Sequence, residues 1–229
     1  MNNSFWSTKK TVLFKWLKSL KANYKRILFF YLILLSVFAI LLLIDQLTKT
    51  YLFNHEIISP NQSNEPQAES IYPIAKKYGG EDHGSGLLGI RSVWHHGVTI
   101  FENSNLAFIQ FLSIALLVLI LLFPLFTYEH QNWYAIAIAL GMLAAGDFGN
   151  ALDRFMFNNF VKDLFYVPFY ENWLGKTVGT FNFADFSIFV GILSILIATI
   201  VSLIVNAYKK YKANKKKDQN DQEMNNEVA

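Results

Sequence analysis

The sequence predicts an all-α polytopic membrane protein with four transmembrane helices and a small extracytoplasmic platform that is rich in β-structure. Two observations predict this fold class. Of the 229 residues, 53% are hydrophobic, and they come in long blocks rather than at the spacing of amphipathic helices. These blocks approach the roughly 20 residues that a helix needs to cross a bilayer.

Four segments have the length and composition of membrane spans, and we expect helices over residues 27–44, 106–128, 133–154 and 186–208. Pro124 lies near the end of the second segment, where a helix can stop or kink. The third is apolar only as far as Gly146, but its helical pattern continues through Arg154. The fourth follows Asp185 directly, and a carboxylate at that depth is costly unless it has partners or a task.

Lysine and arginine residues predict the orientation of the spans. Seven of them lie in residues 1–26 and six lie in residues 209–217. Because cytoplasmic segments carry the excess of these residues, both termini are predicted to be cytoplasmic, which an even number of spans permits. The segments of about residues 50–105 and 155–184 then face outward.

The segments outside the spans differ in character. Residues 1–26 mix aromatic residues with lysines at roughly helical spacing, which predicts an amphipathic helix on anionic lipid. Residues 27–208 form the membrane domain, and the basic, polar residues 209–229 are expected to be disordered. Residues 92–102 are the best strand candidate. The aromatic loop 165–173 is either a lid or a bilayer anchor.

The predicted topology gathers polar residues at the outer boundary of the membrane. Spans one and three run outward and span four runs inward, so the polar ends of these spans meet on that side. The residues concerned, with one from the outer loop, are Asp45, Asp147, Asn150, Asp153, Arg154, Asp163, Asn182 and Asp185. Capping of a helix end at the interface would explain any one of them. Five aspartates and an arginine on one side are harder to explain in that way.

Two spacings indicate how these ends pack. Asp45 and Lys49 are four residues apart and therefore share a helical face. Gly141, Ala145 and Gly149 form a stripe of small residues, which lets a neighbouring helix approach closely. The third span is therefore expected to pack tightly just below its polar end.

Five motifs, in order along the chain, resemble those of lipoprotein signal peptidase, also called signal peptidase II. They are DQLTK (45–49), ENSNLAF (102–108), GDFGNALDR (146–154), VKDLF (161–165) and FNFADFSI (181–188). The last three together are highly specific, and the resemblance runs over about residues 27–208. The chain departs from the family pattern at four positions, none of which removes a catalytic carboxylate: Asn105 replaces glycine, Leu164 replaces phenylalanine, Lys162 replaces an apolar residue, and Asp147 is an added acid.

The resemblance implies a monomeric aspartic endopeptidase in the cell membrane of a bacterium, without a metal or other cofactor. Its partners would be membrane lipid and diacylglyceryl-modified prolipoproteins, which it would cleave on the N-terminal side of the lipid-modified cysteine. The catalytic pair would be Asp163 and Asp185. Substrate binding or structural support is implied for Asp45, Lys49, Asn103, Gly146, Gly149, Asn150, Asp153, Arg154, Asn182 and Ala184.

The chemistry agrees with the residue types. The chain has no cysteine, which excludes thiolate nucleophiles and cysteine-bound metals. Two neighbouring carboxylates can hydrolyse a peptide without a metal, because they cannot both ionise easily and therefore divide the roles of base and acid. The ionised member takes a proton from water, and the protonated member hydrogen-bonds the carbonyl oxygen.

Two other functions can be set against the residues. A zinc site would need His83, His95 and His96, but adjacent histidines on a strand point to opposite faces, and no H-E-x-x-H is present. A small transporter or proton channel would also use acids within the membrane. Such a relay should place acids through the depth of the bilayer, whereas the inner halves of the four spans carry none. No nucleic-acid motif is present.

Overall fold

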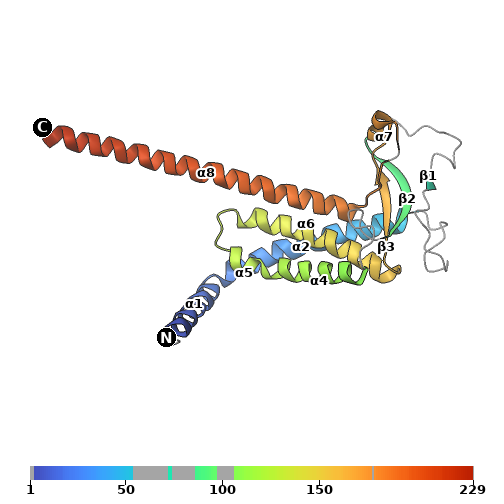
Figure 1. Cartoon of the computed structure of the whole chain (residues 1–229), viewed down its shortest axis with the longest axis horizontal. Helices are drawn as coiled ribbons and strands as arrows, with labels where there is room; N and C mark the ends of the chain where they lie inside the picture. The colour runs from blue at the N-terminus through green and yellow to red at the C-terminus, as the bar shows by residue number, and fades with distance from the viewer. Residues whose placement is uncertain (1–2, 54–71, 74–85, 97–105, 177, 229) are drawn as a thin grey trace.

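The computed structural model of the chain describes residues 3–53, 72–73, 86–96, 106–176 and 178–228. Within them, four helical segments are long and apolar enough to cross a membrane, which confirms the predicted fold class; they are Tyr24–Tyr51, Ala107–Thr127, Trp133–Met156 and Phe183–Lys215. A small antiparallel sheet lies at one end of the bundle, and both termini lie at the other side of the molecule (Figure 1).

The central helix of the bundle is α6 (Trp133–Met156), which packs against α2 (Tyr24–Tyr51), α4 (Leu106–Leu122) and α8 (Phe183–Val228). It is the most deeply buried of the four spans. Small residues make this possible: a methyl group on Gly141 would lie 2.7 Å from the backbone oxygen of Leu34 in α2. The stripe of small residues therefore packs against a neighbouring helix, as the spacing predicted.

The second span is interrupted where the sequence predicted. Helix α4 ends at Leu122, and the short helix α5 (Pro124–Thr127) begins at the proline. Proline has no N–H to donate and suits the first position of a helix, so it ends α4 and starts α5.

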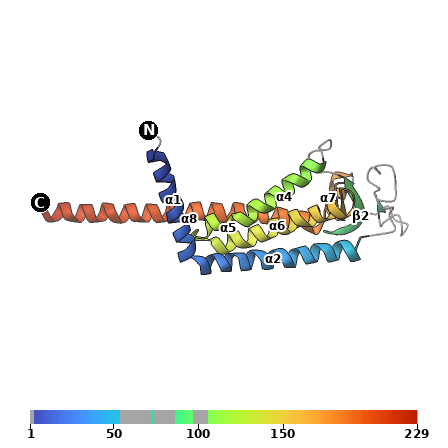
Figure 2. The same cartoon turned by 90° about the horizontal axis from the view of Figure 1, so that it is seen from below.

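The two ends of the chain are helical. Helix α1 (Asn3–Ala22) leaves the bundle at an angle (Figure 2), and Val12, Leu13 and Phe14 are exposed on it. Helix α8 continues to Val228, over residues for which the sequence predicted disorder. The physical reason is composition: no glycine or proline follows Gly191, and Lys, Gln, Glu and Ala are good helix formers that propagate an existing helix.

The sheet has the order β1-β2-β3 among the described residues, with β1 at Tyr72–Pro73, β2 at Gly89–His96 and β3 at Phe160–Tyr166. Strand β2 overlaps the predicted strand, whose last six residues lie outside the described residues. The interpretation of residues 165–173 as a loop was wrong, because they form the end of β3 and helix α7 (Pro168–Leu174). Pro168 begins α7 and Gly175 ends it with a left-handed φ of 64°.

Candidate functional site

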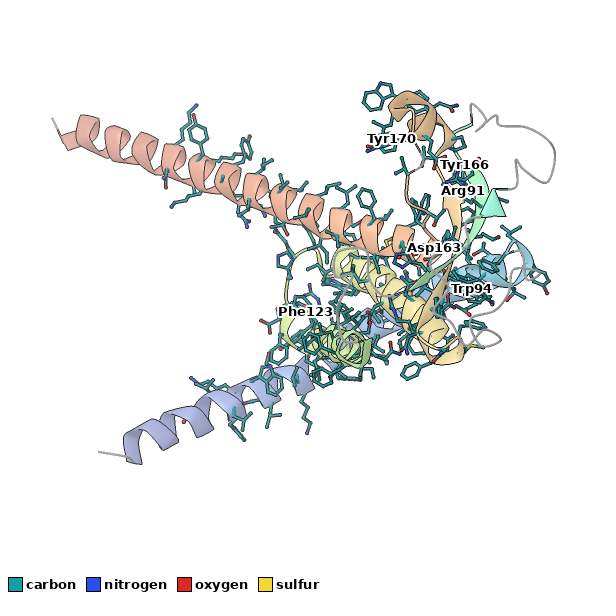
Figure 3. All side chains as sticks on the ribbon, turned by 45° about the vertical axis from the view of Figure 1, so that its right-hand side comes forward. Arg91, Trp94, Phe123, Asp163, Tyr166 and Tyr170 are labelled. Carbon is teal, nitrogen blue, oxygen red and sulfur yellow. The ribbon has the colours of Figure 1, made fainter. Side chains whose placement is uncertain are left out.

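Asp163 lies on β3, in the part of the sheet nearest the bundle (Figure 3). Helix α6 ends at Met156, and the chain then turns through Asn158 and Asn159, which have φ angles of 51° and 70°. Asparagine tolerates this left-handed region better than most residues. The turn leads into β3, where Asp163 pairs with Val93 of β2 and is only 5% exposed.

Asp185 lies in the first turn of α8 and is fixed by reciprocal bonds with Asn182. The backbone N–H of Asp185 donates to Asn182 Oδ1 at 2.9 Å, and the backbone N–H of Asn182 donates to Asp185 Oδ2 at 3.1 Å. This is a capping box, with aspartate in place of the usual Glu or Gln. Asn150 Nδ2 of α6 donates to the other oxygen, Asp185 Oδ1, at 2.8 Å. The carboxylate is therefore oriented by two helices.

Asn182 connects the two predicted catalytic aspartates. Its Nδ2 donates to Asp163 Oδ1 at 3.0 Å and to Asn150 Oδ1 at 2.9 Å. Next to it, Phe181 forms an antiparallel bridge with Phe165 of β3, with N–O distances of 2.9 and 2.8 Å. The start of α8 is thus bonded to the strand that carries Asp163, and both aspartates lie in one polar network.

The surroundings of Asp163 suit it to hold a proton. Burial raises the pKa of Asp163 well above its ordinary value, and the negative charge of Asp185 raises it further. The charge of Lys49 and the hydrogen bond from Asn182 act in the opposite direction but do not cancel the rise. Of the two carboxyl groups, Asp163 is therefore the one that its surroundings suit to carry a proton.

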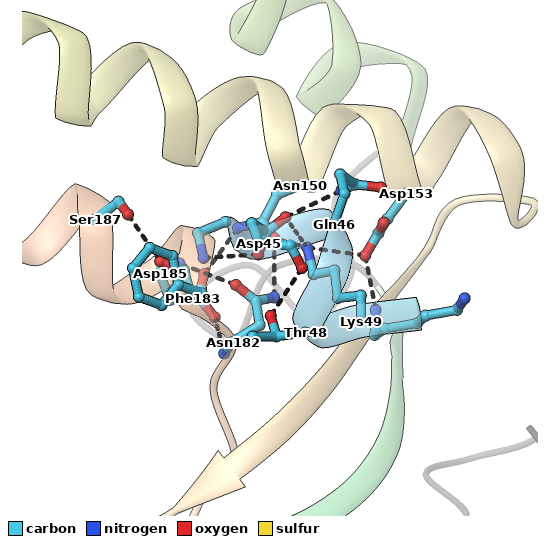
Figure 4. A network of polar contacts seen from close by, with 12 residues as sticks. Asp45, Gln46, Thr48, Lys49, Asn150, Asp153, Asn182, Phe183, Asp185 and Ser187 are labelled. Carbon is cyan, nitrogen blue, oxygen red and sulfur yellow. Dashed lines mark hydrogen bonds and ion pairs between the residues drawn. The ribbon is translucent and has the colours of Figure 1, made fainter. Parts of the chain in front are cut away.

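Lys49 is the centre of the supporting network (Figure 4). Its Nζ lies 2.9 Å from Asp45 Oδ2, 3.0 Å from Asp153 Oδ2 and 3.4 Å from Asn150 Oδ1. The lysine and both aspartates are buried. A buried charge that loses its partner is strongly destabilising, so the three side chains depend on one another.

The same carboxylates fix the two elements that carry the predicted catalytic pair. Asp45 Oδ1 accepts the backbone N–H of Ala184 at 2.9 Å, which ties α2 to the start of α8. Asp153 Oδ2 accepts the backbone N–H of Lys162 at 3.0 Å, which ties α6 to β3. The network therefore positions the backbone next to both Asp163 and Asp185.

Two glycines of α6 allow this close packing. A methyl group on Gly149 would lie 2.7 Å from Asp45 Oδ2 and 3.2 Å from the Cβ of Ala184. A methyl group on Gly146 would overlap the backbone oxygen of Ala184. Both positions predicted from the sequence thus lie where α6 meets the start of α8.

The remaining residues singled out from the sequence do not all contact Asp163 or Asp185. The charge of Arg154 acts on both Asp163 and Asp185. Asp147 accepts a hydrogen bond from Ser113 Oγ at 2.8 Å and so joins α6 to α4. Asn103 and Asn105 lie outside the described residues.

Two features beside the site were not predicted. Lys162 extends to the face of β3 opposite Asp163, where its Nζ lies 4.1 Å from the ring centre of Phe157 and 5.5 Å from those of Phe53 and Trp94. Burial lowers the pKa of this lysine. Arg91 and Glu171 form a buried ion pair. Neither cluster could be assembled from local spacing, because Phe53 and Trp94 are distant in sequence from Lys162, and Arg91 is distant from Glu171.

The described residues hold no group of three His, Asp or Glu side chains that could bind a metal ion. The cationic position between Asp45 and Asp153 is taken by the ammonium group of Lys49.

The chain is similar to known membrane enzymes. Residues 37–201 match the family model for signal peptidase (SPase) II. Two solved structures, each described as a bacterial membrane enzyme structure by the in meso method, are 21% identical to the chain, with TM-scores of 0.53 and 0.50. The matches cover 74% and 72% of this chain and 88% and 91% of the other chains, and they support the fold. None of the curated proteins compared with the chain matches it. Because the family match spans most of the chain, the protein belongs to the signal peptidase II family of aspartic-type lipoprotein signal peptidases.

Proposed function

We propose that this enzyme removes signal peptides from prolipoproteins by cleaving before the lipid-modified cysteine, and that Asp163 and Asp185 are its catalytic pair. The observation that carries the proposal is the bridge through Asn182, which binds the side chain of Asp163 and caps the helix whose first turn carries Asp185. Two carboxyl groups held in one buried network are what peptide hydrolysis by an aspartic mechanism needs.

The roles of the two aspartates follow from their surroundings. Asp163, whose pKa is raised, carries the shared proton and donates a hydrogen bond to the scissile carbonyl oxygen. Asp185, an acceptor of two N–H groups, takes a proton from the attacking water. The water oxygen bonds to the carbonyl carbon and gives a gem-diolate. When the C–N bond breaks, the cysteine amine takes the proton that Asp185 received from the water, and the signal peptide leaves with a carboxyl group.

The proposed orientation places this pair at the extracytoplasmic face, with both termini in the cytoplasm. The excess of lysine at both ends supports it. The sheet and α7 lie at the end of the bundle away from the turn between α5 and α6 (Figure 1). A substrate whose signal peptide still spans the membrane would present its cleavage site at the same boundary.

The test is cleavage of a diacylglyceryl-modified prolipoprotein, and of its unmodified form, by the purified enzyme in detergent. We expect cleavage of the modified form only. Asp163→Asn and Asp185→Asn should each lower kcat by about 100-fold or more, because an amide cannot share or transfer the proton. The double variant should be little worse than either single variant, because the pair acts as a unit.

Asp147→Asn is the matched control, because it changes an aspartate of the same region whose hydrogen bond goes to Ser113. We expect it to keep parental cleavage. Near-parental cleavage by Asp163→Asn or Asp185→Asn would refute the assigned pair, and equal cleavage of the unmodified substrate would refute the assigned specificity.

A further inference from the structure

Arg91 of β2 and Glu171 of α7 form a two-point ion pair outside the membrane spans. Arg91 Nη1 lies 2.6 Å from Glu171 Oε1, and Nη2 lies 2.6 Å from Oε2. Both side chains are almost fully buried. The guanidinium group also lies 3.9 Å from the ring centre of Tyr166 of β3 (Figure 3). This planar, two-point contact fixes orientation as well as distance.

The same carboxylate holds the chain that follows α7. Glu171 Oε1 accepts the backbone N–H of Val178 at 2.9 Å. At the other end of α7, the backbone N–H of Phe169 donates to the oxygen of Gly86, just before β2. Helix α7 is therefore bound to β2 through Glu171 and to the residues before β2 through Phe169. The chain that follows α7 is bound through the same Glu171 carboxylate.

The returning chain leads directly to the catalytic pair. Thr180 lies two residues after Val178, and its Oγ1 is 3.5 Å from Asp163 Oδ2. Phe181 then bonds to Phe165, and Asn182 bonds to Asp163 and Asp185. On β2, Arg91 is two residues from Val93, the pairing partner of Asp163. A shift of residue 178 would thus be passed to the residues that bridge the two aspartates.

We propose that Arg91 and Glu171 are positioning residues of the reaction. Arg91 orients Glu171, Glu171 binds the backbone of Val178, and this contact holds Asn182 where it bridges Asp163 and Asp185. This inference rests on the function proposed above. Stability alone is a weak reason for burying such a pair, since apolar side chains of similar volume often serve stability as well or better. An apolar pair, however, has no oxygen to accept the N–H of Val178.

This difference gives the test. The double variant Arg91→Met/Glu171→Leu replaces the ion pair by apolar groups and removes the acceptor for Val178. We expect its Tm in detergent to stay close to the parental value. Its kcat on the diacylglyceryl-modified prolipoprotein should fall by about tenfold or more, with KM changed much less, because misplacing a reacting group slows the chemical step.

The single variant Glu171→Gln should show the opposite pattern. It keeps an oxygen for Val178 but leaves the charge of Arg91 buried without its counter-ion. Its Tm should fall, yet it should keep more of its kcat than the double variant. Glu129→Gln is the control. Glu129 lies in the turn between α5 and α6 and accepts a hydrogen bond from Ser19 of α1, so this variant should keep both Tm and kcat.

The outcomes are distinct. If kcat follows Tm in both variants, or if the double variant keeps parental kcat, the positioning role is refuted. If the double variant fails to fold, Tm and kcat are measured instead on the charge-swapped variant Arg91→Glu/Glu171→Arg. Arginine at position 171 cannot accept the Val178 N–H either. Failure of both to fold would make the pair a folding requirement and also refute the role. A parental enzyme that does not cleave the prolipoprotein would instead refute the proposed function.

Discussion

At the residue scale, each polar group of the site is held by more than one neighbour. Asp185 is oriented by its own helix cap and by Asn150, and Asp163 accepts hydrogen bonds from Asn182 and Thr180. Asn150 Oδ1 also accepts a hydrogen bond from Asn182 and lies 3.4 Å from Lys49 Nζ. A catalytic pair needs this kind of support, because small displacements of reacting groups are costly in rate.

Part of this network could be predicted from the sequence. The predicted topology gathered Asn182 and Asp185 at the outer end of the fourth span, although the capping box between them was not predicted. The spacing of Asp45 and Lys49 indicated a shared helical face, and their ion pair forms at 2.9 Å. The third partner of Lys49, Asp153, could not be found by spacing because it lies on another helix. Arg91 and Glu171 are 80 residues apart, so no local spacing connects them.

The raised pKa of Asp163 predicts a pH-dependent stability. Below the ordinary carboxyl pKa, Asp163 is protonated in the folded and the unfolded chain, and its stabilising contribution is fully present. As pH rises toward the folded pKa, the unfolded chain ionises first, so the free energy of unfolding falls with pH until the folded group also ionises. Asp163→Asn should abolish this component. Thermal unfolding in detergent across this pH range should therefore show a steeper loss of Tm for the parent than for Asp163→Asn, and equal slopes would contradict it.

At the element scale, α6 organises the site because it contacts α2, α4, α8 and β3. Long apolar runs and Pro124 made the helices predictable, since the bilayer leaves few alternatives for a segment of about 20 apolar residues. Strand β3 and helix α7 were not predicted. They are short and rich in aromatic residues, and they are specified by pairing with β2 and by the buried Glu171 rather than by local pattern.

Helix spacing at the site should be sensitive to one methyl group. In Gly146→Ala the new Cβ would overlap the backbone oxygen of Ala184 and crowd Ile188, so α8 must move away from α6. Such overpacking typically costs about 1–3 kcal/mol, and here it also displaces the helix start that carries Asp185. We expect a lower Tm and a lower kcat.

Gly179→Ala is the matched control, because a methyl group there would meet no atom within 4 Å. Its Tm and kcat should stay near the parental values. Parental cleavage and Tm in Gly146→Ala would show that α6 and α8 can separate without cost. The close contact at Gly146 would then not be needed to position Asp185.

At the scale of the whole molecule, the arrangement of charge and burial is consistent with a protein that works at one membrane surface. The outer faces of α2, α4 and α8 expose apolar side chains that suit lipid, whereas the buried charges of the network gather beside the sheet. Helix α7 adds exposed aromatic side chains on that side, including Trp173, which is 73% exposed. The platform and the turn between α5 and α6 should therefore face opposite sides of the membrane.

The absence of cysteine from the sequence makes this orientation testable with single-cysteine variants. Lys176, just after α7, and Gln131, in the turn between α5 and α6, are both exposed. In intact cells, a membrane-impermeant maleimide should label Lys176→Cys, and it should label Gln131→Cys only after the membrane is permeabilised. The parental protein, without a thiol, gives the background. Labelling in the reverse order would place Asp163 and Asp185 in the cytoplasm, where an exported prolipoprotein would not present its cleavage site, and the proposed function would fail with the orientation.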